Sequence, residues 1–144
     1  MQLILENLAA TEALAAHLAA LARPGDALLL HGPLGAGKSA LARAFLRAAT
    51  GEPALEVPSP TFTLVQSYEL PGGSAAHHFD LYRLSGPGGL QELGWDEARA
   101  GIILVEWPER LGTLAPQAAL HLTLAPGDEE DSRIATLKGW EDRL

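Results

Sequence analysis

The residues best suited to chemistry stand together in the segment from Gly32 to Ser39, GPLGAGKS, which fits the pattern G-x-x-x-x-G-K-[ST]. Its glycines let the backbone curl so that successive N–H groups point into one cavity and can bind phosphate oxygens. Lys38 supplies an ammonium for the β- and γ-phosphates, and the Ser39 hydroxyl is placed to bind Mg²⁺. The pattern therefore predicts the phosphate-binding loop (P-loop) of a nucleotide-binding protein.

The residues on either side of this loop have the pattern that a P-loop requires. An apolar run of strand length, Ala27 to Leu30, precedes it, and Leu41, Phe45 and Ala48 then recur at helical spacing. The start of such a helix adds unpaired N–H groups and the positive end of the helix dipole. We therefore expect a strand, a phosphate-binding turn and a helix in direct succession.

A P-loop needs a carboxylate that binds Mg²⁺ or orients the attacking water, and two residues are candidates. Glu106 is the first choice, because it follows the apolar run 102–105 and ligands bind at the carboxyl ends of strands. Asp80 is the second, and its alternative role is a structural partner for Arg83 or a turn residue. In Ser59-Pro60-Thr61 a hydroxyl could reach the metal or the γ-phosphate as part of a switch segment, although an ordinary strand start has the same pattern. The sequence leaves open which carboxylate contacts the metal.

The remaining polar and aromatic candidates favour structural roles. The loose spacing of His77 and His78 beside Asp80 favours packed or surface histidines over a transition-metal site. The only asparagine is Asn7, so the N-K-x-D segment of guanine-specific P-loop proteins is absent and ATP is the expected nucleotide. The tryptophans are expected in the core or an interface, without a chemical role; they are Trp95, Trp107 and Trp140.

Periodicity predicts the elements that position these groups. The expected strands are 3–5, 27–30, 61–70, 76–84, 102–105, 119–125 and 133–137. A helix is expected after Thr11 as its N-cap, a second after the P-loop, and a short one over 90–100, broken at Gly94. These elements predict a single-domain α/β P-loop NTPase fold. Its central sheet would be mostly parallel, with an antiparallel hairpin formed by 61–70 and 76–84 and helices on both faces.

Composition limits the classes of function. A chain of 144 residues is long enough for one buried core, so residues 1–144 are expected to form a single P-loop ATPase domain. The net charge of −8 argues against strong direct binding to nucleic acid by the chain alone. There is no cysteine for a disulfide or a thiolate metal site. The first residues lack the pattern of a secretion signal and no apolar run approaches ~20 residues, so we expect a cytoplasmic protein without a membrane segment.

Four segments in this order carry a resemblance to a known family: GPLGAGKS at 32–39, SPTFTLVQSY at 59–68, HFDLYRL at 78–84 and LVEWPER at 104–110. Over residues 26–111 the chain resembles the bacterial ATPase of the tRNA threonylcarbamoyladenosine pathway, the TsaE (YjeE) family. The P-loop is shared by many families, whereas the other three segments in this order are far more specific.

The resemblance implies an ATPase, weak alone and stimulated by partners, that binds and hydrolyses ATP with Mg²⁺. Hydrolysis would drive cycling of the protein complex that transfers the threonylcarbamoyl group to tRNA. It implies Glu106, Asp80 and Thr61 as catalytic groups, and Ser39 and Glu106 as metal ligands. It places at the nucleotide Gly35, Ala36, Gly37, Lys38, Ser39, Ala40, Thr11 and Arg133. Ala40 departs from the family, whose members often have a second hydroxyl there.

Two other functions fit a P-loop. One is a small-molecule or nucleoside kinase, but such kinases usually add a lid and an acceptor pocket, and ~60 residues after the hairpin leave little room for both. The other is a nucleotide-dependent binding module without turnover. Phosphate release, alone and with partner proteins, separates the three functions.

Overall fold

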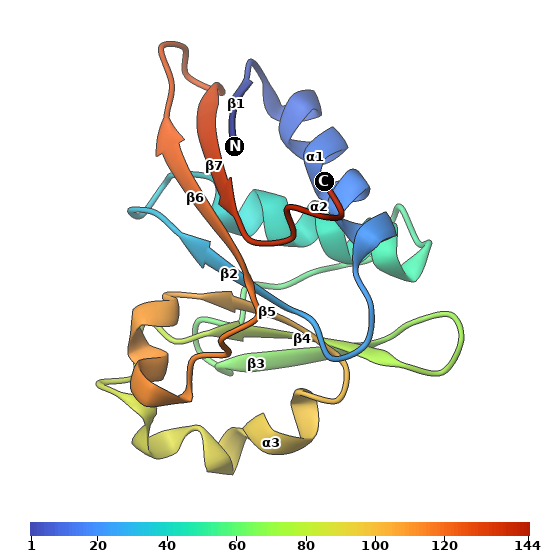
Figure 1. Cartoon of the computed structure of the whole chain (residues 1–144), viewed down its shortest axis with the longest axis vertical. Helices are drawn as coiled ribbons and strands as arrows, with labels where there is room; N and C mark the ends of the chain where they lie inside the picture. The colour runs from blue at the N-terminus through green and yellow to red at the C-terminus, as the bar shows by residue number, and fades with distance from the viewer.

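A single seven-stranded sheet forms the centre of the structure, and the helices pack against it (Figure 1). The computed structural model describes residues 1–144. The strand order across the sheet is β1-β7-β6-β2-β5-β4-β3. The strands are β1 (Gln2–Leu5), β2 (Ala27–His31), β3 (Val65–Glu69), β4 (Ala75–Asp80), β5 (Ile102–Glu106), β6 (Leu120–Pro126) and β7 (Arg133–Lys138).

The centre of the sheet is parallel and both edges are antiparallel. Strands β6, β2, β5 and β4 pair in parallel, so their carboxyl ends meet at one edge of the sheet. The expected hairpin of β3 and β4 forms the antiparallel end on one side. On the other side β7 pairs antiparallel with both β6 and β1. A short turn joins β6 to β7, and only antiparallel neighbours can be joined so directly. The expected α/β fold is confirmed.

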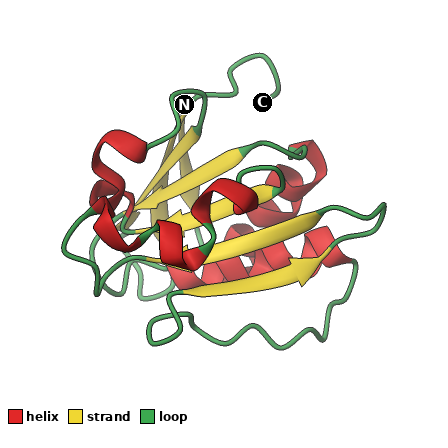
Figure 2. Ribbon diagram, turned by 90° about the horizontal axis from the view of Figure 1, so that it is seen from below, coloured by secondary structure: helices red, strands yellow, loops and turns green.

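Helices cover both faces of the sheet (Figure 2). On one face lie α1 (Leu8–Leu21) and α2 (Lys38–Thr50). Short helical segments cover the other face over β2, β5 and β4; they are η1 (Pro87–Gly89), η2 (Gln91–Leu93), α3 (Trp95–Ala98) and η3 (Pro108–Leu114). Residues 27–30 of β2 are all apolar because Leu28 and Leu30 pack in the core beneath α1 and α2, while Ala27 and Leu29 pack in the core on the opposite face.

Helix α1 begins earlier than expected. Its N-cap is Asn7, whose Oδ1 accepts a hydrogen bond from the Ala10 N–H at 2.9 Å. Asparagine caps helices as well as threonine does, so the true cap lies one turn before the residue we expected. Thr11 is instead a buried residue within the helix.

The hairpin strands are shorter than their sequence pattern predicts. Strand β3 begins at Val65 rather than Thr61, because Leu64 has a left-handed backbone (φ 71°) and residues 60–63 form a turn. Strand β4 ends at Asp80, so Tyr82 does not lie on the strand. The Asp80 carboxylate accepts hydrogen bonds from both the Thr61 hydroxyl and the Tyr82 N–H, which holds both turns against the strand end.

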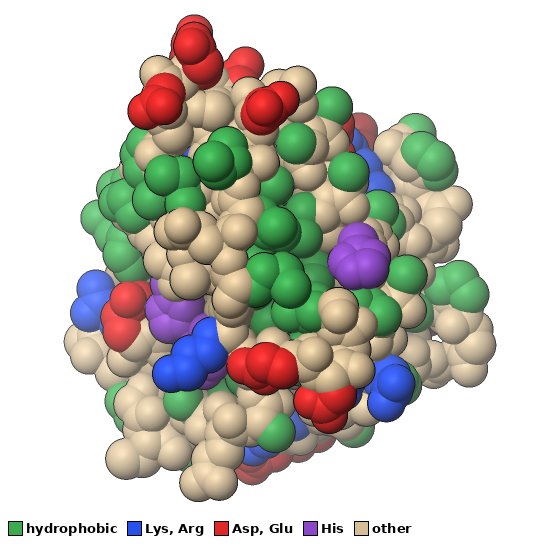
Figure 3. Space-filling view, turned by 45° about the horizontal axis from the view of Figure 1, so that its top comes forward, with side chains coloured by type: hydrophobic (Ala, Val, Ile, Leu, Met, Phe, Trp, Pro, Cys, Tyr) green, Lys and Arg blue, Asp and Glu red, His purple; other side chains and the backbone are tan.

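The turn between β6 and β7 is acidic. Asp and Glu side chains gather at the top of the face in Figure 3, where Figure 1 places the turn between β6 and β7; the sequence of this turn includes Asp128-Glu-Glu-Asp131. None of the helices has both the length and the apolarity to cross a bilayer.

Candidate functional site

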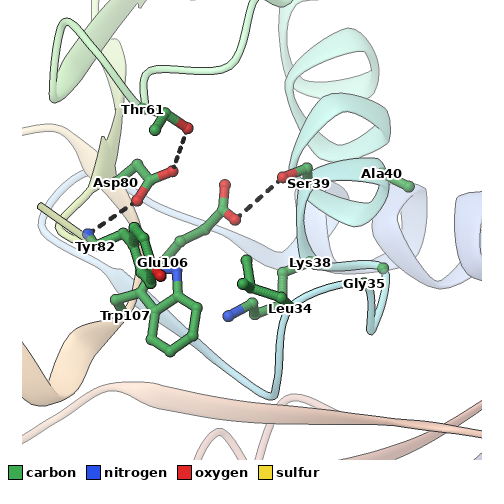
Figure 4. Close-up of a pocket in the computed structure, with 11 residues that line it drawn as sticks. Leu34, Gly35, Lys38, Ser39, Ala40, Thr61, Asp80, Tyr82, Glu106 and Trp107 are labelled. Carbon is green, nitrogen blue, oxygen red and sulfur yellow. Dashed lines mark hydrogen bonds between the residues drawn. The ribbon is translucent and has the colours of Figure 1, made fainter.

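A cavity of ≈ 370 Å³ opens where β2, β4 and β5 end and α2 begins (Figure 4). The lining residues are Leu34, Gly35, Gly37, Lys38, Ser39, Ala40, Thr61, Asp80, Tyr82, Glu106 and Trp107. The structure thus brings together the site residues expected from sequence, apart from Thr11, Ala36 and Arg133. Segments far apart in the chain meet here because parallel strands end at a common edge.

The glycine-rich loop, residues 32–39, has the backbone that its glycines permit. Gly32 has φ 141°, and a Cβ there would lie 2.5 Å from the Leu124 carbonyl oxygen of β6. Gly37 has φ 99° and is the N-cap of α2, without a side-chain cap. The first N–H groups of α2 therefore have no partner in the chain and, with the positive end of the helix dipole, favour an anion in the cavity.

Lys38 is buried at the mouth of this loop. Its Nζ donates a hydrogen bond to the Gly32 carbonyl oxygen at 2.6 Å and lies 3.7 Å from the centroid of the Trp107 ring. Burial lowers the pKa of Lys38, while the negative charges of Glu106, Glu109 and Asp80 oppose that shift. The ammonium is the cationic group that this cavity offers to phosphate.

Two carboxylates lie side by side at the strand ends. Asp80 on β4 and Glu106 on β5 are paired in register. Figure 4 shows their side chains next to each other at the cavity. The Ser39 hydroxyl donates a hydrogen bond to Glu106 Oε1 at 3.2 Å, which links β5 to the start of α2. Sequence reasoning chose both residues independently, and the register of two parallel strands places them together.

Asp80 is tied to the segment that the sequence proposed as a switch. Its Oδ2 accepts a hydrogen bond from Thr61 Oγ1 at 3.0 Å, and its Oδ1 accepts one from the Tyr82 N–H at 3.0 Å. Thr61 Oγ1 also shares a hydrogen bond with Ser59 Oγ at 2.8 Å. The alternative ion pair with Arg83 is not formed. The Arg83 guanidinium instead lies 5.5 Å from the ring centroid of Phe62.

The donors around Ser39 fit a magnesium ion. A hydroxyl and a carboxylate oxygen are hard ligands. Mg²⁺ is usually held by one or two protein groups, together with water and substrate phosphates. Ser39 Oγ and Glu106 Oε1 are such a pair at the edge of the cavity.

Three expected nucleotide contacts lie outside the cavity lining. Ala36 is fully buried in the core beneath the loop. Arg133 Nε donates to the Ala36 carbonyl oxygen at 2.8 Å, so Arg133 supports the glycine-rich loop from β7. Thr11 is buried within α1. Contact of these residues with a nucleotide stays a prediction.

Sequence reasoning gave no role at this site to Trp107 or His78, nor to the lining residues Leu34 and Tyr82. Trp107, expected to have no chemical role, lines the cavity and faces Lys38, with its own backbone in the left-handed region (φ 60°). Its position directly after Glu106 was the available signal. His78, expected to be a packed or surface residue, is buried and bonded to Glu106, whereas His77 Nδ1 is bonded to Ser67 Oγ at 2.7 Å. Nothing in the sequence separates these two histidines except strand alternation.

The fold and this loop define a mixed α/β protein of the P-loop NTPase fold, with two carboxylates beside the loop. The family model described as "Threonylcarbamoyl adenosine biosynthesis protein TsaE" matches residues 5–135. The chain belongs to this family, as its sequence segments led us to expect.

Curated relatives and a solved structure agree with this assignment. Three relatives are named tRNA threonylcarbamoyladenosine biosynthesis protein TsaE. The protein of Rickettsia felis is 40% identical over 88% of this chain and 74% of its own length, and that of Rickettsia bellii is 36% identical over 94% and 93%. The Bacillus subtilis protein is 37% identical over 86% and 77%. The crystal structure of Bacillus subtilis YdiB has a TM-score of 0.76 and 30% identity, covering 99% of this chain and 87% of that one. The family acts in the biosynthesis of threonylcarbamoyladenosine in tRNA.

Proposed function

We propose that this chain binds ATP with Mg²⁺ and hydrolyses it slowly, and that hydrolysis drives cycling of the protein complex that transfers the threonylcarbamoyl group to tRNA. One observation carries the proposal. The cavity places an ammonium, a hydroxyl and a carboxylate around the free end of a helix. These are Lys38, Ser39 and Glu106, the groups that phosphoryl chemistry on a P-loop requires.

Phosphate binding falls to the glycine-rich loop. The unpaired N–H groups at the start of α2 receive phosphate oxygens, and Lys38 leaves the Gly32 carbonyl and the Trp107 ring to pair with them. Ser39 and Glu106 would hold Mg²⁺, which when bound would supply positive charge to offset that of the phosphates.

Asp80 and Glu106 differ in their surroundings, and this difference suggests different roles. Both oxygens of Asp80 accept hydrogen bonds from the turns at 60–63 and 82–83. Asp80 therefore links the Ser59-Pro60-Thr61 segment to the end of β4. The segment can change its position there when a phosphate binds in the cavity. Glu106 lies between Ser39 and the core, and we assign to it the contact with the γ-phosphate end of the nucleotide.

The surface beside the cavity suits a protein partner. Phe62, next to Thr61, has 82% of its surface exposed, and the cavity residues Leu34 and Tyr82 are also exposed. Large exposed apolar side chains grouped at one place mark sites of protein association. The net charge of −8, with the acidic turn in Figure 3, disfavours direct binding to tRNA.

Reconstitution tests this function. Purified chain, partner complex, tRNA, ATP and Mg²⁺ are combined, and both phosphate release and modified tRNA per partner complex are counted. We expect slow release alone, faster release with partners, and repeated rounds of modification only in the full mixture. Lys38→Ala should stop both. Equal numbers of rounds without the chain would overturn the coupling, phosphate transfer to a small acceptor would indicate a kinase, and binding without release would indicate a module.

A further inference from the structure

We propose that His78 is a positioning residue for ATP hydrolysis, which acts by holding the Glu106 carboxylate in one orientation. The inference rests on the proposed function. His78 Nε2 and Glu106 Oε2 are 2.7 Å apart, and the two residues are only 2% and 3% exposed. The proposed function gives His78 no role, although the histidine contacts the Glu106 carboxylate.

Strand register explains why these side chains meet. His78 on β4 pairs with Leu104 on β5, and Asp80 pairs with Glu106 two residues further on. Because side chains alternate along a strand, His78 and Asp80 share one face of β4, while Leu104 and Glu106 share the same face of β5. Leu104 belongs to the core between the sheet and α2. His78 therefore reaches Glu106 from beneath, on the side of the sheet where α2 begins.

The hydrogen bonds define the form of the ring. A carboxylate only accepts, so Nε2 must carry the proton and donate to Glu106 Oε2. His78 Nδ1 is buried and has no hydrogen-bond partner. A buried N–H without a partner is unfavourable, whereas a bare ring nitrogen leaves no donor unsatisfied. The hydrogen bond to Glu106 therefore depends on the N–H at Nε2, and no hydrogen bond to Nδ1 competes with it.

This bond leaves one oxygen of Glu106 for the cavity. Oε2 is engaged by His78, and Oε1 faces Ser39, whose hydroxyl donates to it. The carboxylate then presents a single oxygen at a fixed place, as partners behind a metal ligand commonly ensure. Nucleotide affinity, by contrast, depends on the loop N–H groups and on Lys38, and the hydrogen bonds of His78 reach neither.

Three variants test this role. His78→Leu keeps bulk and removes the donor, His78→Gln keeps an N–H group that reaches Glu106, and His77→Leu is the matched control, because His77 bonds Ser67 instead. We expect His78→Leu to lower kcat by at least about tenfold while KM for ATP changes by less than about threefold. His78→Gln should recover most of kcat, and His77→Leu should leave it unchanged.

A second readout does not depend on turnover. The affinity of the protein with a bound ATP analogue for Mn²⁺, measured by electron paramagnetic resonance, should fall in His78→Leu and return in His78→Gln. In a Glu106→Gln background, His78→Leu should cause little further loss of kcat, because the two residues act as one unit. If His78→Leu loses the native circular dichroism spectrum, His78→Asn serves as the variant whose shorter amide does not reach Oε2.

The outcomes separate this inference from the function on which it rests. A wild-type chain that releases no phosphate, alone or with partners, overturns the proposed function. A folded His78→Leu with wild-type kcat and Mn²⁺ affinity overturns the role of His78 alone. So does a folded His78→Gln that is no better than His78→Leu, or a double variant whose losses simply add.

Discussion

Lys38 Nζ lies 3.7 Å from the centroid of the Trp107 ring, close enough for a cation–π contact. The same ammonium donates to the Gly32 carbonyl oxygen at 2.6 Å. The Gly32 carbonyl and the Trp107 ring thus both contact the ammonium at the mouth of the glycine-rich loop. An arriving phosphate must therefore exchange these contacts for charge-assisted hydrogen bonds, and the surroundings of the Trp107 ring change as it does so.

Trp107 is thus predicted to report nucleotide binding. Addition of a non-hydrolysable ATP analogue with Mg²⁺ should change the tryptophan fluorescence in a saturable way. Trp107→Phe should lose most of this change, although Trp95 and Trp140 still emit. Lys38→Ala should weaken binding at least about tenfold, because the cation that pairs with the phosphates is lost. Calorimetry measures the affinity, and circular dichroism checks the fold. Unchanged affinity in Lys38→Ala would remove the basis of the phosphate site.

Glu106 is predicted to matter more for turnover than for binding. Glu106→Gln keeps the shape of the side chain and removes its charge, so it should lower the rate of phosphate release by at least about tenfold. The affinity for ATP should change less, because the loop and Lys38 still hold the phosphates. Asp80→Asn is the comparison. If Asp80→Asn lowers the rate in this way and Glu106→Gln does not, the two roles are reversed.

Phe62 is predicted to contribute to partner coupling without contributing to basal activity. The ring is exposed and faces the Arg83 guanidinium, so Phe62→Ala should leave the fold and the unstimulated ATPase rate intact. Stimulation by the partner complex should fall by at least about threefold, since exposed aromatic residues often carry association energy. Ile4→Ala is a matched control, because Ile4 is 75% exposed on edge strand β1. Equal stimulation of both variants would place the partner elsewhere.

Stability is predicted to fall in mild acid. Burial lowers the pKa of His31 below its ordinary value of 6.5; His121 and Lys38 add to this shift and Glu109 opposes it. Burial also lowers the pKa of His77. Both groups thus take up protons more readily in the unfolded chain. The loss of stability that they cause is absent above the ordinary pKa. It begins as the pH falls through 6.5 and levels off below the pKa of the folded state.

The melting temperature measures this effect. It should drop by a few degrees between about pH 7.5 and about pH 5.5. Replacing His31 and His77 by Gln should flatten the curve over that window. His17→Gln, at an exposed position on α1, should not. A wild-type curve that rises toward acid would contradict the direction of both shifts.

Features that depend on residues close together in the chain could be predicted from the sequence. The glycine-rich loop is eight consecutive residues between an apolar run and a helical repeat, so its pattern predicts both the turn and the open helix end. Glu106 was found in the same way, because it follows a buried strand, and ligands bind where such strands end. Local spacing and one topological rule were sufficient for these groups.

Contacts between side chains far apart in the chain could not be predicted in this way, because they depend on the order and register of the strands. The pairs Ser39–Glu106 and His78–Glu106 join residues 67 and 28 positions apart, and they depend on β5 lying between β2 and β4 with one particular register. A shift of one residue in that register would turn His78 to the opposite face. The start of β3 was misplaced for the same reason. A hydrogen bond from Thr61 to Asp80, 19 positions away, holds residues 60–63 in a turn despite their strand-forming composition.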